Sequence, residues 1–270
     1  MARKAKKDDD IPRRRIARFG WVPDLPDSRD LTYSAPLVSR TPLPSKVDLR
    51  KALPPVYDQG QLGSCTANAI GTAFQFGQQK QKLKDFVPSR LFIYYNERDM
   101  EATIGQDSGA YIRDGIKSVH KLGVCPETKW PYDPSPFPPN PRLTLKPTQA
   151  CYTEAKKHIV EQYARVPRTL PQMKGCLASG YPFVYGFTVY ESFDSAKVAK
   201  TGEVQMPKSG EEVLGGHAVL AVGYDDKTQR FIVRNSWGTG WGIKGNFTMP
   251  YSYLLDGNLS DDFWTIRLVK

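Results

Sequence analysis

The sequence is poor in the residues that carry acid–base and nucleophilic chemistry near neutral pH. Its 270 residues include only three histidines and four cysteines. The cysteines lie far apart and form no C-x-x-C pair: Cys65, Cys125, Cys151 and Cys176. This spacing argues against zinc and against a scaffold dense in disulfides. We expect no metal and no other cofactor. We expect all four cysteines to be free thiols, and the sequence also allows a disulfide between Cys125 and Cys151.

Long apolar segments are also missing. No run of about 18 apolar residues is present, so no membrane span and no membrane partner are predicted. The basic N-terminus is not followed by the apolar stretch that a secretory signal needs. A cytoplasmic location is therefore the default expectation, with non-classical export left open.

Acidic residues are outnumbered, but the excess positive charge is concentrated at one end. The formal net charge is +10, and residues 1–20 contain eight Lys or Arg and three Asp. Residues 1–15 carry almost no apolar groups and are expected to be disordered. Because neither a phosphate-binding loop nor stacked aromatics accompany this charge, a nucleic-acid partner is not expected.

The rest of the chain has patterns of regular structure. Aromatics, prolines and charges alternate over residues 19–33, which predicts an extended strap packed on the body of the protein. Apolar spacing and terminal Gly or Pro predict helices over about 64–78, 88–97, 112–122, 151–163 and 171–179. Runs of β-branched and aromatic residues predict strands over 183–189, 217–224, 231–235, 246–249 and 263–269. Helices early and strands late indicate an α+β chain.

One cysteine stands at the start of a predicted helix. Gly60 and Gly63 punctuate a turn, Ser64 is a candidate helix cap, and Cys65 follows it. Unpaired N–H groups and the helix dipole lower the pKa of a thiol placed there, which favours the thiolate nucleophile. Taken alone, the motif favours a buried structural cysteine over a catalytic one.

Two later segments favour the catalytic interpretation. His120 and His158 lie in polar helical contexts and are predicted at the surface, whereas His217 follows two glycines and opens an apolar strand. Asn235 follows another strand, and its side-chain oxygen can accept a hydrogen bond from one imidazole nitrogen while the other faces a thiol. Trp237 over that bond would exclude water and strengthen it.

Taken together, these segments resemble the papain-like cysteine peptidases over about residues 44–270. The matching segments, in family order, are Gln59, Gly63–Cys65, His217–Val219 with Val222–Tyr224, and Asn235–Gly242, supported by Asp107–Tyr111, Gly123–Glu127 and Trp130–Asp133. Two positions depart from the family: Leu62 stands where a disulfide cysteine is common, and Thr66 where an aromatic residue is common. Neither departure removes a catalytic group.

The resemblance implies a two-lobed α+β fold with the active site in the cleft between lobes. A helical lobe would occupy mainly residues 60–140, and an antiparallel, barrel-like β lobe mainly 150–270 with 44–58. Residues 1–43 would form the basic tail and the strap, and 44–270 the peptidase domain.

The resemblance also implies roles for individual residues. Cys65 would be a thiolate nucleophile paired with His217 as imidazolium, Asn235 would orient His217, and Gln59 would donate to the oxyanion. Substrate would contact a further set of residues: Ser108, Gly109, Tyr111, Gly216 and Trp237.

The predicted function is that of a cysteine-type endopeptidase acting through a thioester acyl-enzyme on peptide or protein substrates. An exopeptidase, an acyltransferase or a non-catalytic binding module on the same scaffold are the alternatives. We further hypothesise that the strap lies at the cleft and lowers activity. The alternative is a permanent strap placed away from the cleft.

Overall fold

The computed structural model describes residues 19–35, 42–138 and 140–270. The expectations of disorder over residues 1–15 and of a solvated basic tail fall outside these residues. Among the described residues, none of the helices combines the length and the apolar character needed to cross a bilayer.

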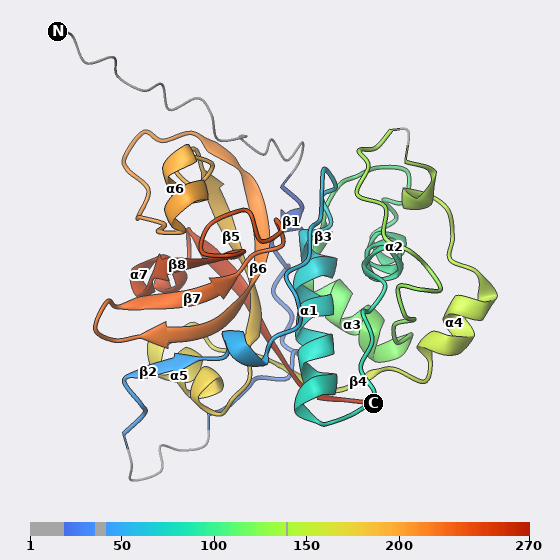
Figure 1. Ribbon diagram of the computed structural model, residues 1–270, viewed down its shortest axis with the longest axis horizontal. Helices are drawn as coiled ribbons and strands as arrows, with labels where there is room; N and C mark the ends of the chain where they lie inside the picture. The colour runs from blue at the N-terminus through green and yellow to red at the C-terminus, as the bar shows by residue number, and fades with distance from the viewer. Residues whose placement is uncertain (1–18, 36–41, 139) are drawn as a thin grey trace, which may run out of the picture.

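The first helices along the chain, up to residue 155, gather on one side of the molecule (Figure 1). The elements on this side are α1 (Cys65–Lys80), α2 (Arg90–Met100), α3 (Ile112–Lys121), α4 (Gln149–Ala155) and the 3₁₀ turn η3 (Pro141–Leu143). Helix α1 is buried on all faces from Cys65 to Gln78, because it lies at the boundary between the helices and the sheet. Helix α3 ends before Gly123, whose φ of 78° suits glycine after a helix, as predicted.

Strands occupy the other side. The seven-stranded sheet contains β2 (Lys46–Asp48), β4 (Val160–Arg165), β5 (Phe183–Tyr190), β6 (Val213–Asp225), β7 (Arg230–Arg234), β8 (Asn246–Pro250) and β9 (Ser260–Val269). The pairing order is β4-β9-β5-β6-β7-β8 with β2 on β6, and all pairs are antiparallel. The remaining short elements are η2 (Arg50–Ala52), α5 (Leu170–Ala178), α6 (Ala196–Thr201) and α7 (Tyr251–Leu255).

This arrangement confirms the α+β prediction. The strand path over the described residues is open, so the β side is barrel-like only in a loose sense. One apolar core joins α1, α2 and α3 to one face of the sheet, and a second, rich in aromatic rings, fills the other face.

The predicted helix over 151–163 is present only in its first part, and its second part was predicted wrongly. Helix α4 ends at Ala155, and β4 begins at Val160. Residues 160–165 pair antiparallel with β9, from Val160 opposite Val269 to Arg165 opposite Trp264. Backbone pairing with a distant strand thus overrides the local helical pattern.

The two histidines predicted at the surface are half-buried. The His120 Nδ1 lies 2.7 Å from the carbonyl oxygen of Val160, and the His158 ring lies 4.6 Å from that of Phe86. Their polar helical neighbours did not reveal these contacts, which depend on β4 and on the segment before α2.

The strap enters the middle of the molecule. Its strand β1 (Trp21–Val22) pairs in parallel with β3 (Ala110–Tyr111), the short strand that precedes α3. Figure 1 shows β1 between β6 and β3, at the boundary between the helices and the sheet. The prediction that the strap packs on the body is confirmed by this pairing.

Candidate active site

Cys65 is the first residue of α1, and its side chain is fully buried. Its sulfur accepts a hydrogen bond from the backbone N–H of Ala218 on β6 at 3.3 Å. Ser64 precedes the helix, but its side chain makes no capping bond: its Oγ lies 2.6 Å from the Tyr132 hydroxyl. Ser64 thus occupies the predicted N-cap position, but its side chain ties the helix start to the segment that carries Tyr132 instead of capping the helix.

His217 lies on β6 directly before the residue that contacts the sulfur. Its Nε2 is 2.8 Å from Asn235 Oδ1, which also accepts the backbone N–H of Ser236 at 2.8 Å. Because an amide oxygen only accepts, Nε2 must carry the proton in the neutral ring, and Nδ1 presents a lone pair. Nδ1 is buried and has no hydrogen-bond partner. Cys65, His217 and Asn235 are thus brought together from α1, β6 and the end of β7.

Aromatic rings enclose this imidazole. The Trp237 ring lies 5.0 Å from it at an interplanar angle of 33°, and Phe187 packs edge-on at 5.7 Å. Phe19 of the strap covers it at 6.3 Å. Trp237, a residue that is only 2% exposed, therefore packs against the imidazole on the side where the sequence placed it.

Gln59 is held in one orientation by two hydrogen bonds. Ser236 Oγ donates to its side-chain oxygen at 2.6 Å, and its Nε2 donates to the Leu62 carbonyl at 2.8 Å. The Nε2 amide carries two N–H groups, so one remains to serve another acceptor. Since Ser236 follows Asn235, the Gln59 amide belongs to the same hydrogen-bonded cluster as the imidazole.

Burial sets the protonation of the thiol and the imidazole. Burial raises the pKa of Cys65 to about 12, although backbone hydrogen bonds from Ala218 and Gly20 lower it. Burial lowers the pKa of His217 to about 4, against the opposing effect of Asn235. Under the strap, burial therefore favours the neutral thiol and the neutral imidazole and opposes the predicted thiolate–imidazolium pair. The strap supplies part of the burial.

Three residues predicted to bind substrate lie against the strap, and the fourth, Ser108, precedes one of them in the chain. An added Cβ on Gly109 would approach the Gly20 oxygen to 2.3 Å, and one on Gly216 would approach the Trp21 oxygen to 2.3 Å. Tyr111 pairs with Val22 in the short parallel sheet, and Ser108 Oγ donates to the Gly109 carbonyl at 3.1 Å. The chain's own N-terminal segment therefore occupies the surface predicted for a peptide.

A group of strap-binding residues was missed by the sequence analysis. Asp30 of the strap binds Arg113 through both carboxylate oxygens, and Arg113 also donates to the Leu25 carbonyl at 2.5 Å. Asp24 accepts from the Arg113 backbone N–H at 3.2 Å and from the Trp264 indole at 3.1 Å. The clustering of Asp residues in the strap was the only available signal, and it did not identify partners on α3 and β9.

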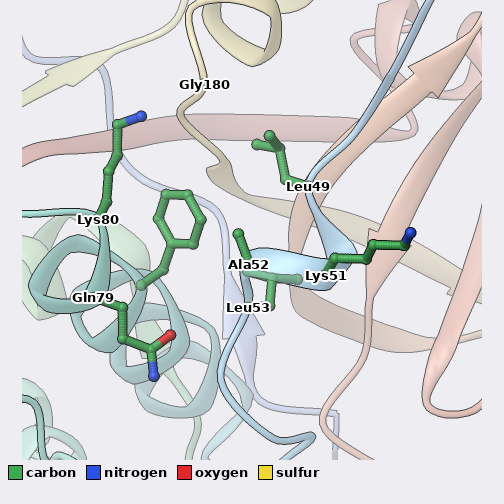
Figure 2. A pocket seen from close by; sticks show the side chains of 8 residues that line it. Leu49, Lys51, Ala52, Leu53, Gln79, Lys80 and Gly180 are labelled. Atoms are coloured by element: carbon green, nitrogen blue, oxygen red, sulfur yellow. The ribbon is translucent and has the colours of Figure 1, made fainter. Parts of the chain in front are cut away.

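A separate hollow of about 410 Å³ lies between η2 and the C-terminal half of α1. Figure 2 shows Lys51 and Lys80 at opposite sides of it. The lining residues are Leu49, Lys51, Ala52, Leu53, Phe76, Gln79, Lys80 and Gly180. None of them belongs to the predicted site.

All four cysteines, which lie within the described part of the chain, are free and buried. The Cys125–Cys151 disulfide left open by the sequence is therefore absent in this structure. Cys65 differs from the other three cysteines because its sulfur contacts β6, the strand that carries His217, and the Gly20 backbone of the strap.

Comparison with known proteins gives a consistent result. The family model for papain family cysteine proteases matches residues 43–254. The crystal structure of xylellain, a cysteine protease from Xylella fastidiosa, is 46% identical, covers 93% of this chain and 96% of its own, and superposes with a TM-score of 0.88.

Two further relatives are similar over most of the chain. An uncharacterized peptidase C1-like protein of Acanthamoeba polyphaga mimivirus is 46% identical over 93% of this chain and 87% of its own length. Digestive procathepsin L 3 of the Tenebrio molitor larval midgut shares the fold, with a TM-score of 0.65 at 20% identity over 86% of this chain and 74% of that one. The chain belongs to the papain family of cysteine proteases, and its fold is papain-like.

Proposed function

We propose that the chain is a cysteine-type endopeptidase whose nucleophile is Cys65, with His217 as the acid–base group and Asn235 as its positioning residue. One observation carries the proposal: the imidazole is held through Nε2 by Asn235 at 2.8 Å, next to the residue whose N–H contacts the Cys65 sulfur. A nucleophile beside a base that a third group orients is the general arrangement for acyl transfer.

Each group in the proposal has a defined step. His217 Nδ1 accepts the thiol proton, and the sulfur attacks the peptide carbonyl. The tetrahedral oxyanion is stabilised by Gln59 Nε2 and the Cys65 N–H. The imidazolium then protonates the leaving amine as the C–N bond breaks, which leaves a thioester. Water, deprotonated by His217, attacks the thioester carbonyl, and the thiol recovers its proton as the carboxylic acid leaves.

We also infer that the strap restrains this activity. Gly20 and Trp21 lie against Gly63, Gly109 and Gly216, where a substrate backbone would have to pass. The Ala110 N–H already donates to the Gly20 carbonyl at 2.8 Å. A peptide can reach Cys65 only after the strap leaves, and its departure also removes part of the burial that keeps the thiol neutral.

Hydrolysis of an internally quenched peptide library by the full chain, under reducing conditions, tests the function. Mass spectrometry of the products separates internal cleavage from removal of terminal residues, and adding an amine nucleophile detects transfer of the acyl group. Internal cleavage is expected. Labelling of Cys65 by an epoxide without any turnover, in the full chain and in a chain lacking residues 1–40, would argue against a peptidase.

Docking of the strap is expected to weaken as the pH rises. Burial, and then the neighbouring Asp262 carboxyl, raise the pKa of Asp24 from 3.8 to about 7. Because the pKa of Asp24 in the docked strap lies above its ordinary value, the protonated carboxyl favours docking. This favourable contribution to the free energy of docking is fully present below about pH 4 and is lost as the pH rises through about 7. Arg113 faces Asp24 and opposes the shift only in part.

The rate of Cys65 alkylation by iodoacetamide measures this dependence. The ratio of the rate in the full chain to that in a Trp21→Ala variant should rise between pH 4 and 7 and then level off, since the ratio cancels the ionisation of the thiol. Asp24→Asn should flatten the rise. Asp27→Asn, a change on the same strap at a carboxyl held by Arg29, should preserve it. A rise that persists in Asp24→Asn would contradict the assignment.

A further inference from the structure

The turn that precedes the proposed nucleophile is held at its middle by a side chain from another part of the chain. Gly63 donates its backbone N–H to both carboxylate oxygens of Asp107, at 3.1 Å to Oδ1 and 3.0 Å to Oδ2. Gly63 lies between Gln59 and Cys65, which carry the two proposed oxyanion donors. The Asp107 carboxylate therefore anchors this segment, residues 59–65, which we call the oxyanion turn.

A tyrosine extends this contact to the segment that precedes α3. The Tyr94 hydroxyl on α2 donates to Asp107 Oδ1 at 2.6 Å and accepts the Gly109 N–H at 3.0 Å. Gly109 leads into β3, whose first N–H binds the strap backbone at 2.8 Å in the place proposed for a peptide. We call residues 109–111 the β3 edge. Two side chains thus join the oxyanion turn to the β3 edge through a continuous set of hydrogen bonds.

The groups of this junction converge on one buried point. An added Cβ on Gly63 would lie 3.1 Å from Asp107 Oδ1, 3.4 Å from the Tyr94 hydroxyl and 3.5 Å from the Gly109 nitrogen. Tyr94 is fully buried and Asp107 is 4% exposed. All four cysteines are free, so no disulfide joins the two segments within the described chain. Hydrogen bonds shielded from water therefore set the spacing between the oxyanion turn and the β3 edge.

Arg98 fixes the position of the junction from below. Its fully buried guanidinium lies 4.3 Å from the centre of the Tyr94 ring. It also donates to the carbonyls of Ile104 and Gln106, at 3.0 and 3.1 Å, and so holds the loop that presents Asp107. Burial, followed by the nearby Asp107 carboxylate, raises the pKa of Tyr94 well above its ordinary value. The hydroxyl therefore keeps its proton and stays a donor.

We propose that Asp107 and Tyr94 are positioning residues with separate roles: Asp107 fixes the oxyanion turn for the acyl-transfer steps, and Tyr94 fixes the β3 edge for the peptide backbone. The proposal rests on the proposed peptidase function and deepens it. A loosened oxyanion turn displaces its donors, and a displacement of about 1 Å can cost about 100-fold in rate. A loosened β3 edge has to be ordered by each substrate, which weakens binding of the ground state and of the transition state equally.

Peptide hydrolysis by the full-length Trp21→Ala variant as parent separates the two roles. This parent lacks the indole that the strap buries, so docking of the strap affects KM less than in the wild type. Adding Tyr94→Phe should raise KM about five-fold and leave kcat within about two-fold, because the β3 edge loses one hydrogen bond. Adding Asp107→Ala should lower kcat at least about 10-fold, because it frees the oxyanion turn.

Asp107→Asn is the conservative variant that should rescue the rate. Its amide oxygen can accept from the Tyr94 hydroxyl and the Gly63 N–H in place of Oδ1, so kcat should return to within about three-fold of the parent. A kcat as low as that of Asp107→Ala would contradict a role through these hydrogen bonds.

Tyr253→Phe is the matched control for the loss of a buried hydroxyl. Tyr253 is 2% exposed, and its hydroxyl donates to the Thr188 carbonyl at 2.7 Å, in the core on the other face of the sheet. Its removal should change KM and kcat by less than about two-fold. A rise in KM equal to that of Tyr94→Phe would overturn the role of Tyr94, since any buried hydroxyl would then have the same effect.

Amide hydrogen exchange, followed by NMR in the same variants, tests the junction without any turnover. Tyr94→Phe should speed exchange of the Gly109 N–H at least about 10-fold and leave that of Gly63 within about three-fold, and Asp107→Ala should do the reverse. A general loss of stability would instead speed exchange throughout α1. Exchange that rises equally at both glycines in both variants would overturn the separate roles.

The two measurements separate the possible failures. Hydrolysis in which Tyr94→Phe and Asp107→Ala do not differ in their effects on KM and kcat overturns the positioning roles and leaves the peptidase intact. Absence of hydrolysis in the parent, together with the expected exchange pattern, overturns the peptidase function, while the two side chains keep their hold on the two segments.

Discussion

Replacing Cys65 by alanine is expected to lower kcat/KM for peptide hydrolysis by at least about 10⁴-fold, because it removes the atom that we propose forms the acyl-enzyme. The residual rate would come from the oxyanion donors and from binding alone. The substitution removes one sulfur atom from a buried position, so the fold should survive. Circular dichroism and the protease resistance of the chain would verify this.

Cys176→Ala provides the matched control for the loss of a buried thiol. Cys176 is as buried as Cys65, but it lies on α5 in the core on the other face of the sheet, where its sulfur contacts the Tyr181 carbonyl at 3.5 Å. Its activity should stay within about two-fold of the wild type. If Cys65→Ala kept more than a tenth of the wild-type kcat/KM, the assignment of the nucleophile would be lost.

Replacing Trp21 by alanine is expected to raise kcat/KM of the full chain by at least about 100-fold. Removing a buried indole typically costs about 3–5 kcal/mol, and each 1.4 kcal/mol is a factor of ten in an equilibrium. Only the docked strap buries Trp21, so the cost falls on the closed form and shifts the population towards the open one. Initial rates on a single fluorogenic peptide, at substrate concentrations well below KM, measure the change.

Leu25→Ala is the matched control on the same strap. The Leu25 side chain is 73% exposed, and only its backbone carbonyl contacts Arg113. It should leave the rate unchanged. Unaltered activity in Trp21→Ala would mean that the strap packs on the protein without restraining it, which is the alternative that the sequence also allowed.

The sequence predicted most of the candidate site, because those residues lie in short segments with distinctive neighbours. Cys65 follows a glycine turn, His217 follows two glycines, and Asn235 precedes a run of glycines and tryptophans. Local pattern was sufficient there. It was insufficient at residues 160–165, where the partner strand β9 lies about a hundred residues away and determines the conformation.

The contacts of the strap were also beyond prediction from local sequence. Its aromatic and proline content predicted an extended segment that packs on the body, but nothing local paired Asp30 with Arg113 or Trp21 with Asp262. Such contacts join positions 83 and 241 residues apart. The effect of burial on the Cys65 thiol was missed for a related reason, since the burial that raises its pKa depends on what covers it.

The strap is covalently part of the enzyme that it covers, and this has a kinetic consequence. An occupant tethered to its own site acts at an effective concentration in the millimolar range for short flexible linkers, whatever the concentration of the protein. Dilution therefore does not activate the chain. A substrate competes with the strap, because it binds only the molecules in which the strap is undocked. The restraint should therefore appear as a raised apparent KM with an unchanged kcat.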